Sequence, residues 1–165
     1  MKTIQMFDYQ CFKEHPTDAP CIINASMSDL MQRNVLEVLQ FKRTYPNALI
    51  LLDLKIAGED ILNAKLAYDA GADLVSCMGF SSDRTLMDVL LIAEENQGQV
   101  IVDMSGCTDI ESRMTDAAIY GAEYAVVPEG VNYSSDSELT VCYYKARISA
   151  YLFTGTDAVQ CEMNI

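Results

Sequence analysis

Residues 48–57 read ALILLDLKIA, an apolar run that ends in an aspartate and a lysine. The run has the length of a strand, and its lack of polar alternation is typical of a strand buried on both faces. Because residues two apart on a strand project to the same face, Asp53 and Lys55 are expected to reach into one site. The stretch therefore predicts a buried parallel strand with a charged pair at its carboxyl end.

The same rhythm continues along the middle of the chain. Strands are predicted at 74–78, 100–104 and 124–127, and amphipathic helices at 59–69, 85–95 and 109–120. Gly71 and Gly121 follow the first and the last of these helices, where a left-handed residue commonly ends a helix. Short apolar strands that alternate with helices predict an α/β fold with a parallel sheet covered by helices.

The two ends of the chain are less regular. Further strands are predicted at 3–7, 21–23 and 150–153, and further helices at 28–43 and around 139–148. This makes seven possible strands and leaves no room for an eighth strand with its helix. No linker or low-complexity tract interrupts the sequence, so residues 1–165 are expected to form one domain.

The composition excludes several classes of function. The 165 residues include 24 acidic and 11 basic side chains, and the net charge of −13 argues against partners such as nucleic acid or an anionic membrane. No apolar run approaches the ~18 residues of a spanning helix, and residues 1–15 lack a signal-peptide pattern. The six cysteines form no C-x-x-C pair, which favours reduced thiols in a cytoplasmic protein.

The carboxyl ends of the predicted strands are where a parallel α/β fold places its functional groups. Asp53 and Lys55 end one such strand, and Asp103 ends another two strands away. A carboxylate can hold a divalent cation or orient an ammonium, and a lysine can stabilise an oxyanion or deliver a proton. The alternative is that Asp53 and Lys55 form a solvated pair and that Asp103 caps a helix. The residues alone leave both interpretations open.

Three segments of the chain carry a family resemblance: residues 48–57, AYDAGADLVSCMG at 67–79 and QVIVDMSG at 99–106. Together they resemble the orotidine 5′-monophosphate decarboxylase suprafamily, and within it 3-keto-L-gulonate 6-phosphate decarboxylase and 3-hexulose 6-phosphate synthase. The resemblance implies a (β/α)₈ barrel that is usually dimeric, with active sites near the dimer interface. It also implies a phosphosugar substrate that forms a magnesium-stabilised enediolate, by decarboxylation or in an aldol reaction.

Length modifies the fold that the resemblance implies. A closed (β/α)₈ barrel typically takes ~250 residues, and this chain has 165. The fold class that we predict is therefore α/β, an incomplete (β/α)₈ TIM-type barrel of about seven parallel strands with flanking helices. Seven strands would leave two unpaired edges, which we expect to be covered by self-association into a homo-oligomer, a dimer, or by the C-terminal segment 157–165.

The resemblance also implies roles for individual residues. Lys55, Asp53 and Asp103 match the catalytic positions: Lys55 would stabilise the enediolate oxygen, and Asp103 would position substrate or water. Asp53 would bind Mg²⁺ with help from Asn24, which stands where the sugar-phosphate branch has a glutamate.

Substrate binding is implied for residues at both ends of the chain. Asp8 matches the aspartate that ends the first strand. Thr154 and Gly155 resemble the start of a glycine turn that helps to bind phosphate through backbone N–H groups.

Two further positions depart from the family pattern. Gly58 replaces the last aspartate of the D-x-K-x-x-D motif, and Pro128 stands in place of a histidine. The sequence therefore supports two hypotheses. The first is a sugar-phosphate carbon–carbon lyase, and the alternative is a catalytically inactive, shortened paralogue that serves as a binding or assembly subunit.

Overall fold

The structure is a computed structural model that describes residues 2–14, 16, 18, 21–26, 35–127, 149–152 and 159–163. Its strands are β1 (Lys2–Asp8), β2 (Cys21–Ser26), β3 (Ala48–Ile56), β4 (Leu74–Met78), β5 (Gln99–Asp103), β6 (Tyr124–Val127), β7 (Ser149–Leu152) and β8 (Val159–Met163). Its helices are α1 (Tyr9–Glu14), α3 (Val35–Thr44), the 3₁₀ turn η1 (Glu59–Ile61), α4 (Leu62–Asp69), α5 (Asp83–Glu95) and α6 (Ile110–Ile119).

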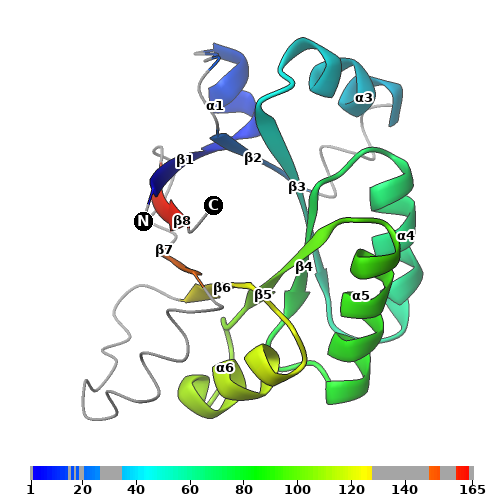
Figure 1. Cartoon of the computed structure of the whole chain (residues 1–165), viewed down its shortest axis with the longest axis vertical. Helices are drawn as coiled ribbons and strands as arrows, with labels where there is room; N and C mark the ends of the chain where they lie inside the picture. The colour runs from blue at the N-terminus through cyan, green and yellow to red at the C-terminus, as the bar shows by residue number, and fades with distance from the viewer. Residues whose placement is uncertain are drawn as a thin grey trace.

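All eight strands belong to one sheet, in the order β7-β6-β5-β4-β3-β2-β1-β8. Every neighbouring pair from β1 to β7 is parallel. The sheet curls into a ring, and the helices lie on its outside (Figure 1). The prediction of an incomplete TIM-type barrel with about seven parallel strands is therefore confirmed.

The eighth strand closes the ring in an unexpected direction. β8 pairs with the outer edge of β1 in antiparallel register, from Lys2 opposite Met163 to Met6 opposite Val159. It also lies beside β7, so it occupies the place between the first and the seventh strand (Figure 1). The expectation that the C-terminal segment covers the seam is thus confirmed at the edge of β1. Self-association stays a prediction.

Two apolar layers lie on the two faces of the sheet. The inner core fills the ring and consists of Ile22, Leu51, Leu74, Ile101, Tyr124 and Val126. On β3, the neighbours of Leu51, which are Ile50 and Leu52, belong to the larger outer core beneath α4, α5 and α6. This alternation on a strand that is buried on both faces explains why its sequence is apolar without interruption.

The helix boundaries follow local signals in the sequence. The Ser82 side chain caps α5 by accepting the Thr85 N–H, and Asp109 caps α6 by accepting the Ser112 N–H. Gly71 has a φ of 97° and Gly121 a φ of 104°, so the predicted left-handed glycines are confirmed.

Several predicted boundaries need correction. The helix expected at 59–69 begins with the 3₁₀ turn η1, and only its second part is the α-helix α4. The strand expected at 21–23 is twice as long and reaches Ser26. Of the helix expected at 28–43, the structure describes α3, and the helix expected around 139–148 lies outside the described residues.

Two composition-based expectations can be compared with the described part of the chain. None of the described helices is long and apolar enough to cross a membrane. Cys21 and Cys77 are buried free thiols, and Cys107 is a partly buried one, in agreement with the expected reduced cysteines. The cytoplasmic location stays a prediction from sequence.

Candidate active site

The inner face of the barrel changes from apolar to polar at the carboxyl ends of four neighbouring strands. The residues at this position are Asn24 on β2, Asp53 on β3, Ser76 on β4 and Asp103 on β5. Each stands two positions after a member of the inner core, so strand alternation directs all four toward the interior of the ring. We call this end of the barrel the mouth, as the place where a parallel barrel can hold a ligand.

Lys55 lies at the centre of the mouth. Its Nζ is 3.7 Å from Oδ2 of Asp53 and 3.5 Å from Oδ2 of Asp103. The lysine side chain is 57% exposed, whereas that of Asp103 is only 10% exposed. The three residues singled out in the sequence therefore form one cluster, in which an accessible ammonium faces two carboxylates.

The backbone of β3 is irregular where it delivers Lys55. Its register with β4 shifts between Leu52 and Ile56, and Lys55 has a φ of 50°, in the left-handed region. Such a conformation is uncommon for a residue with a side chain. Asp53 and Lys55 thus meet as predicted, but through an irregular strand end rather than through simple alternation.

Ser76 ties this irregular segment to the next strand. Its hydroxyl donates to Oδ1 of Asp53 at 2.6 Å and accepts the N–H of Lys55 at 2.8 Å. The sequence analysis missed Ser76. The available signal was a single hydroxyl at an inward position of the buried strand LVSCM.

Asp103 is held by its own loop. Its Oδ1 accepts the N–H of Ser105 at 2.8 Å, which leaves Oδ2 directed at Lys55. The alternative that Asp103 caps a helix is wrong, because Asp109 caps α6.

The neighbouring thiol of Cys77 belongs to the other face. Cys77 packs in the outer core, and burial raises the pKa of its thiol above the ordinary value. A buried neutral thiol is a poor nucleophile, so Cys77 has a packing role.

Asn24 brings an unpaired oxygen to the mouth. Its Oδ1 is buried and has no hydrogen-bond partner among the described residues. A buried amide oxygen without a partner is costly, and oxygen atoms are the ligands that Mg²⁺ prefers. Asn24 and Asp53 therefore fit a magnesium ion that completes its shell with water or substrate. Within the described residues, no group of three or more His, Cys, Asp or Glu could hold a metal by itself.

The remaining sequence candidates are placed only in part. Asp8 is the last residue of β1 and is the register partner of Asn24. Thr154, Gly155 and Pro128 lie outside the described residues. Gly58 precedes η1, and its N–H donates to Oδ1 of Asp60 at 3.2 Å, so that carboxylate is turned toward the backbone.

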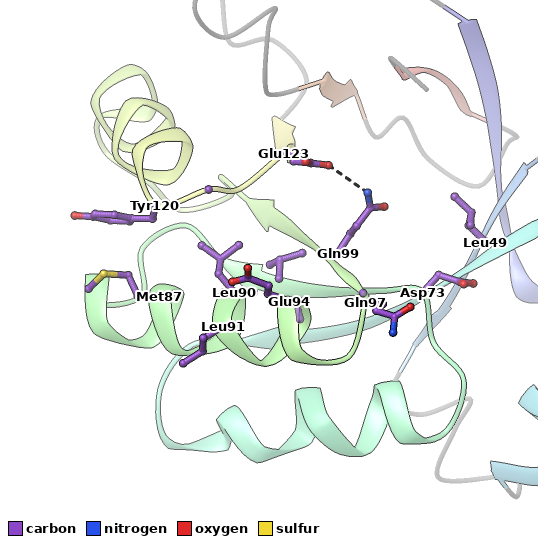
Figure 2. A pocket seen from close by; sticks show the side chains of 14 residues that line it. Leu49, Asp73, Met87, Leu90, Leu91, Glu94, Gln97, Gln99, Tyr120 and Glu123 are labelled. Atoms are coloured by element: carbon purple, nitrogen blue, oxygen red, sulfur yellow. Dashed lines mark hydrogen bonds between the residues drawn. The ribbon is translucent and has the colours of Figure 1, made fainter.

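The largest cavity among the described residues lies away from the mouth. It has a volume of about 790 Å³ and is lined by residues of α5, such as Met87 and Leu91, and by Gln99 at the start of β5 (Figure 2). Gln99 donates to Glu123 at 3.2 Å within it. Because it adjoins the beginnings of the strands, it does not include Lys55 or either carboxylate. The mouth is defined by its chemistry rather than by volume.

Comparison with known proteins places this geometry in context. No family model matches the chain. The chain is 29% identical over 101 residues to a 3-hexulose-6-phosphate synthase of Bacillus subtilis, which covers 61% of this chain and 48% of that protein. It is also 29% identical over 91 residues to the synthase of Mycobacterium gastri, covering 55% of this chain and 44% of that protein. The chain thus spans about half the length of the curated relatives it matches.

Solved structures share the fold. A 3-hexulose-6-phosphate synthase from Salmonella typhimurium superposes with a TM-score of 0.69 at 23% identity, covering 90% of this chain and 75% of that one. KGPDC from Streptococcus mutans, solved in complex with a phosphosugar, gives a TM-score of 0.72 at 15% identity, covering 92% of this chain and 78% of that one. The family resemblance is therefore confirmed at partial coverage: the chain is a relative of the 3-hexulose-6-phosphate synthases and has the barrel fold of the orotidine 5′-monophosphate decarboxylase suprafamily.

Proposed function

We propose that the protein is a sugar-phosphate carbon–carbon lyase, of the decarboxylase or aldol type, that acts through an enediolate. The observation that carries this proposal is the exposed ammonium of Lys55 beside Asp53 and Asp103 at the mouth. In such a reaction the bond next to a ketone breaks, carbon dioxide or an aldehyde leaves, and the electron pair passes onto the ketone oxygen. A proton then adds to the carbon.

Lys55 supplies the positive charge that this electron flow needs. An ammonium fixed beside the developing oxyanion lowers the barrier, and the same group can deliver the proton to carbon. Asp53 and Ser76 orient Lys55 from one side and Asp103 orients it from the other. Asp103, the less exposed carboxylate, is proposed to position a substrate hydroxyl or a water.

A magnesium ion is proposed at the mouth, held by Asp53 and Asn24. When bound, Mg²⁺ would add positive charge near the enediolate oxygens. Mg²⁺ commonly uses one or two carboxylates and completes its shell with water and substrate oxygens. Because Asn24 is neutral, we expect weaker binding than at a site with two carboxylates.

The proposed substrate is a phosphosugar. The structural neighbour from Streptococcus mutans was solved with a phosphosugar, a ligand of that protein. Asp8, at the end of β1, is proposed to contact the sugar. Thr154 and Gly155 are proposed to contact the phosphate.

The decisive experiment measures product release in the presence of Mg²⁺. We expect carbon dioxide from 3-keto-L-gulonate 6-phosphate, or an aldehyde from 3-hexulose 6-phosphate, with the wild-type protein and not with Lys55→Ala. Lys65→Ala is the matched control, because Lys65 is an exposed lysine of α4 paired only with Asp69 in the described structure. Equal background rates in all three proteins would contradict the lyase proposal.

One observation favours the alternative of an inactive paralogue. Gly58 lacks the carboxylate of the family motif, and Asp60, which is nearby, is turned toward the backbone. An inactive binding subunit would still be stabilised by a phosphosugar, since a ligand raises the melting temperature of the folded state that binds it. A thermal shift with phosphosugar and no product in the assay would therefore support this alternative.

The proposed assembly is a homodimer, and it rests on the family resemblance alone. Sedimentation velocity over a range of protein concentrations measures it directly. A single monomeric species at all concentrations would contradict it.

A further inference from the structure

Arg113 on α6 ties together the turn that follows β4. Its Nε donates to the backbone oxygen of Gly79 at 2.5 Å, and its Nη2 donates to that of Ser81 at 3.0 Å. Its Nη1 pairs with the carboxylate of Asp83 at the start of α5. The arginine side chain is only 12% exposed, so this guanidinium is built into the loop rather than left in solvent.

The turn that Arg113 holds is pressed against the end of β5. The N–H of Gly79 donates to the backbone oxygen of Asp103 at 2.6 Å. A Cβ at position 79 would lie 2.7 Å from Sγ of Cys107 and 3.0 Å from that same oxygen of Asp103. No side chain fits there, so the turn has little freedom as long as Arg113 keeps it in place.

Asp103 carries this constraint to the mouth. Its backbone oxygen accepts from Gly79, its Oδ1 accepts from Ser105, and its Oδ2 faces Nζ of Lys55 at 3.5 Å. A continuous series of contacts therefore runs from Arg113 through Gly79 and Asp103 to Lys55.

We propose that Arg113 is a positioning residue for the mouth, which fixes Asp103 and through it the ammonium of Lys55; its kinetic part rests on the lyase function proposed above. Arg113 itself contacts Gly79, Ser81 and Asp83, and acts through Gly79 on Asp103. A guanidinium suits this task because its planar fork donates to several oxygens at once, which a lysine cannot do.

The variants follow from this geometry. Arg113→Ala removes all three contacts, and Arg113→Lys keeps the charge but not the fork. Arg84→Ala is the matched control: Arg84 lies in the first turn of α5, is 87% exposed, and pairs only with Asp88 in the described structure. It removes the same charge without touching the turn at 79–81.

The first readout is hydrogen exchange at the amides of Gly79 and Ser105, which needs no substrate. In Arg113→Ala we expect both amides to exchange roughly tenfold faster, because the loop opens locally. Arg113→Lys should lie between, and Arg84→Ala should match the wild type. Unchanged exchange at both amides in folded Arg113→Ala would overturn the proposal. If that variant does not fold, unchanged exchange in Arg113→Lys would do the same.

The second readout is the split between kcat and KM on whichever phosphosugar the wild type cleaves. We expect Arg113→Ala to lower kcat about ten- to hundredfold with little change in KM, since a small misplacement of a reacting group is costly. A loss confined to KM would overturn the positioning role. Absence of turnover in the wild type would instead contradict the lyase function and leave the exchange result to decide on Arg113.

Discussion

At the scale of single residues, the most informative feature is the backbone of Lys55. Its φ of 50° costs free energy in any residue that carries a Cβ, and strain of this kind concentrates at functional sites. The sequence predicted that Asp53 and Lys55 would meet, because alternation on a strand is a strict pattern. It did not predict the left-handed backbone, since no glycine or asparagine stands at that position to announce it.

A pair of substitutions at Lys55 measures this strain. We expect Lys55→Gly to be more stable than Lys55→Ala by about 1 kcal/mol, because glycine adopts a positive φ without steric cost. Both variants remove the ammonium, so both should lose the proposed activity equally. Urea denaturation gives the two free energies of unfolding. A Lys55→Ala variant as stable as Lys55→Gly would show that the conformation is not strained.

Ser76 and Asn24 illustrate what sequence patterns reveal about a site. Asn24 was found by matching it to a family position, and its unpaired Oδ1 gives that match a physical reason. Ser76 matched no motif and was overlooked, although it holds both Asp53 and the backbone of Lys55. A small hydroxyl inside an apolar strand looks like packing until its partners are known.

At the scale of elements, the order of strands and helices was predictable because each has a clear hydrophobic period. The boundaries were less so. The 3₁₀ turn η1 occupies the start of a segment with helical spacing, and Asp60 within it has a φ of −82° and a ψ of 20°. Apolar spacing cannot distinguish a tight turn from the first turn of an α-helix over so few residues.

The contact between α4 and the start of β5 gives a prediction at this scale. Tyr68 on α4 donates its hydroxyl to the backbone oxygen of Gln99 at 2.7 Å, and its ring covers Gly98. A Cβ at position 98 would lie 2.2 Å from Cε1 of that ring. We expect Gly98→Ala to lower the free energy of unfolding by about 1–3 kcal/mol through overpacking.

Gly58→Ala is the control for this substitution. A Cβ at Gly58 meets nothing within 4 Å. We therefore expect a change within about 0.5 kcal/mol, as for an ordinary surface position. Equal effects of the two alanines in a thermal melt would show that the Tyr68 ring moves aside at no cost.

At the scale of the whole molecule, the closure of the ring is the feature that the sequence described only in part. The seam was predicted from the number of strands, and a covering segment was predicted from the residues left over. The direction of β8 was not, because a strand of five residues has the same period whichever way it runs. An antiparallel strand pairs with the edge of β1 without the crossover helix that a parallel strand needs.

Proline substitutions in β8 test whether this closure contributes to stability. Successive N–H groups of a strand point to opposite sides, so only one of Gln160 and Cys161 donates to β1. We expect one of Gln160→Pro and Cys161→Pro to lower the free energy of unfolding about 1–3 kcal/mol more than the other. The more damaged variant should also self-associate through the freed edge of β1, which sedimentation would detect. Two equally harmless prolines would contradict the pairing.

The antiparallel pairing has a practical consequence for how the protein can be handled. Lys2 stands directly opposite Met163, at the end of the barrel far from Lys55. A tag, a tether to a solid support or a fused fluorescent protein attached next to either residue would leave from that far end. The pairing also brings the two residues to within about 6 Å of each other, so a short peptide could join them into a circle. The protein could then be reopened at a surface turn, such as the one around Gly58.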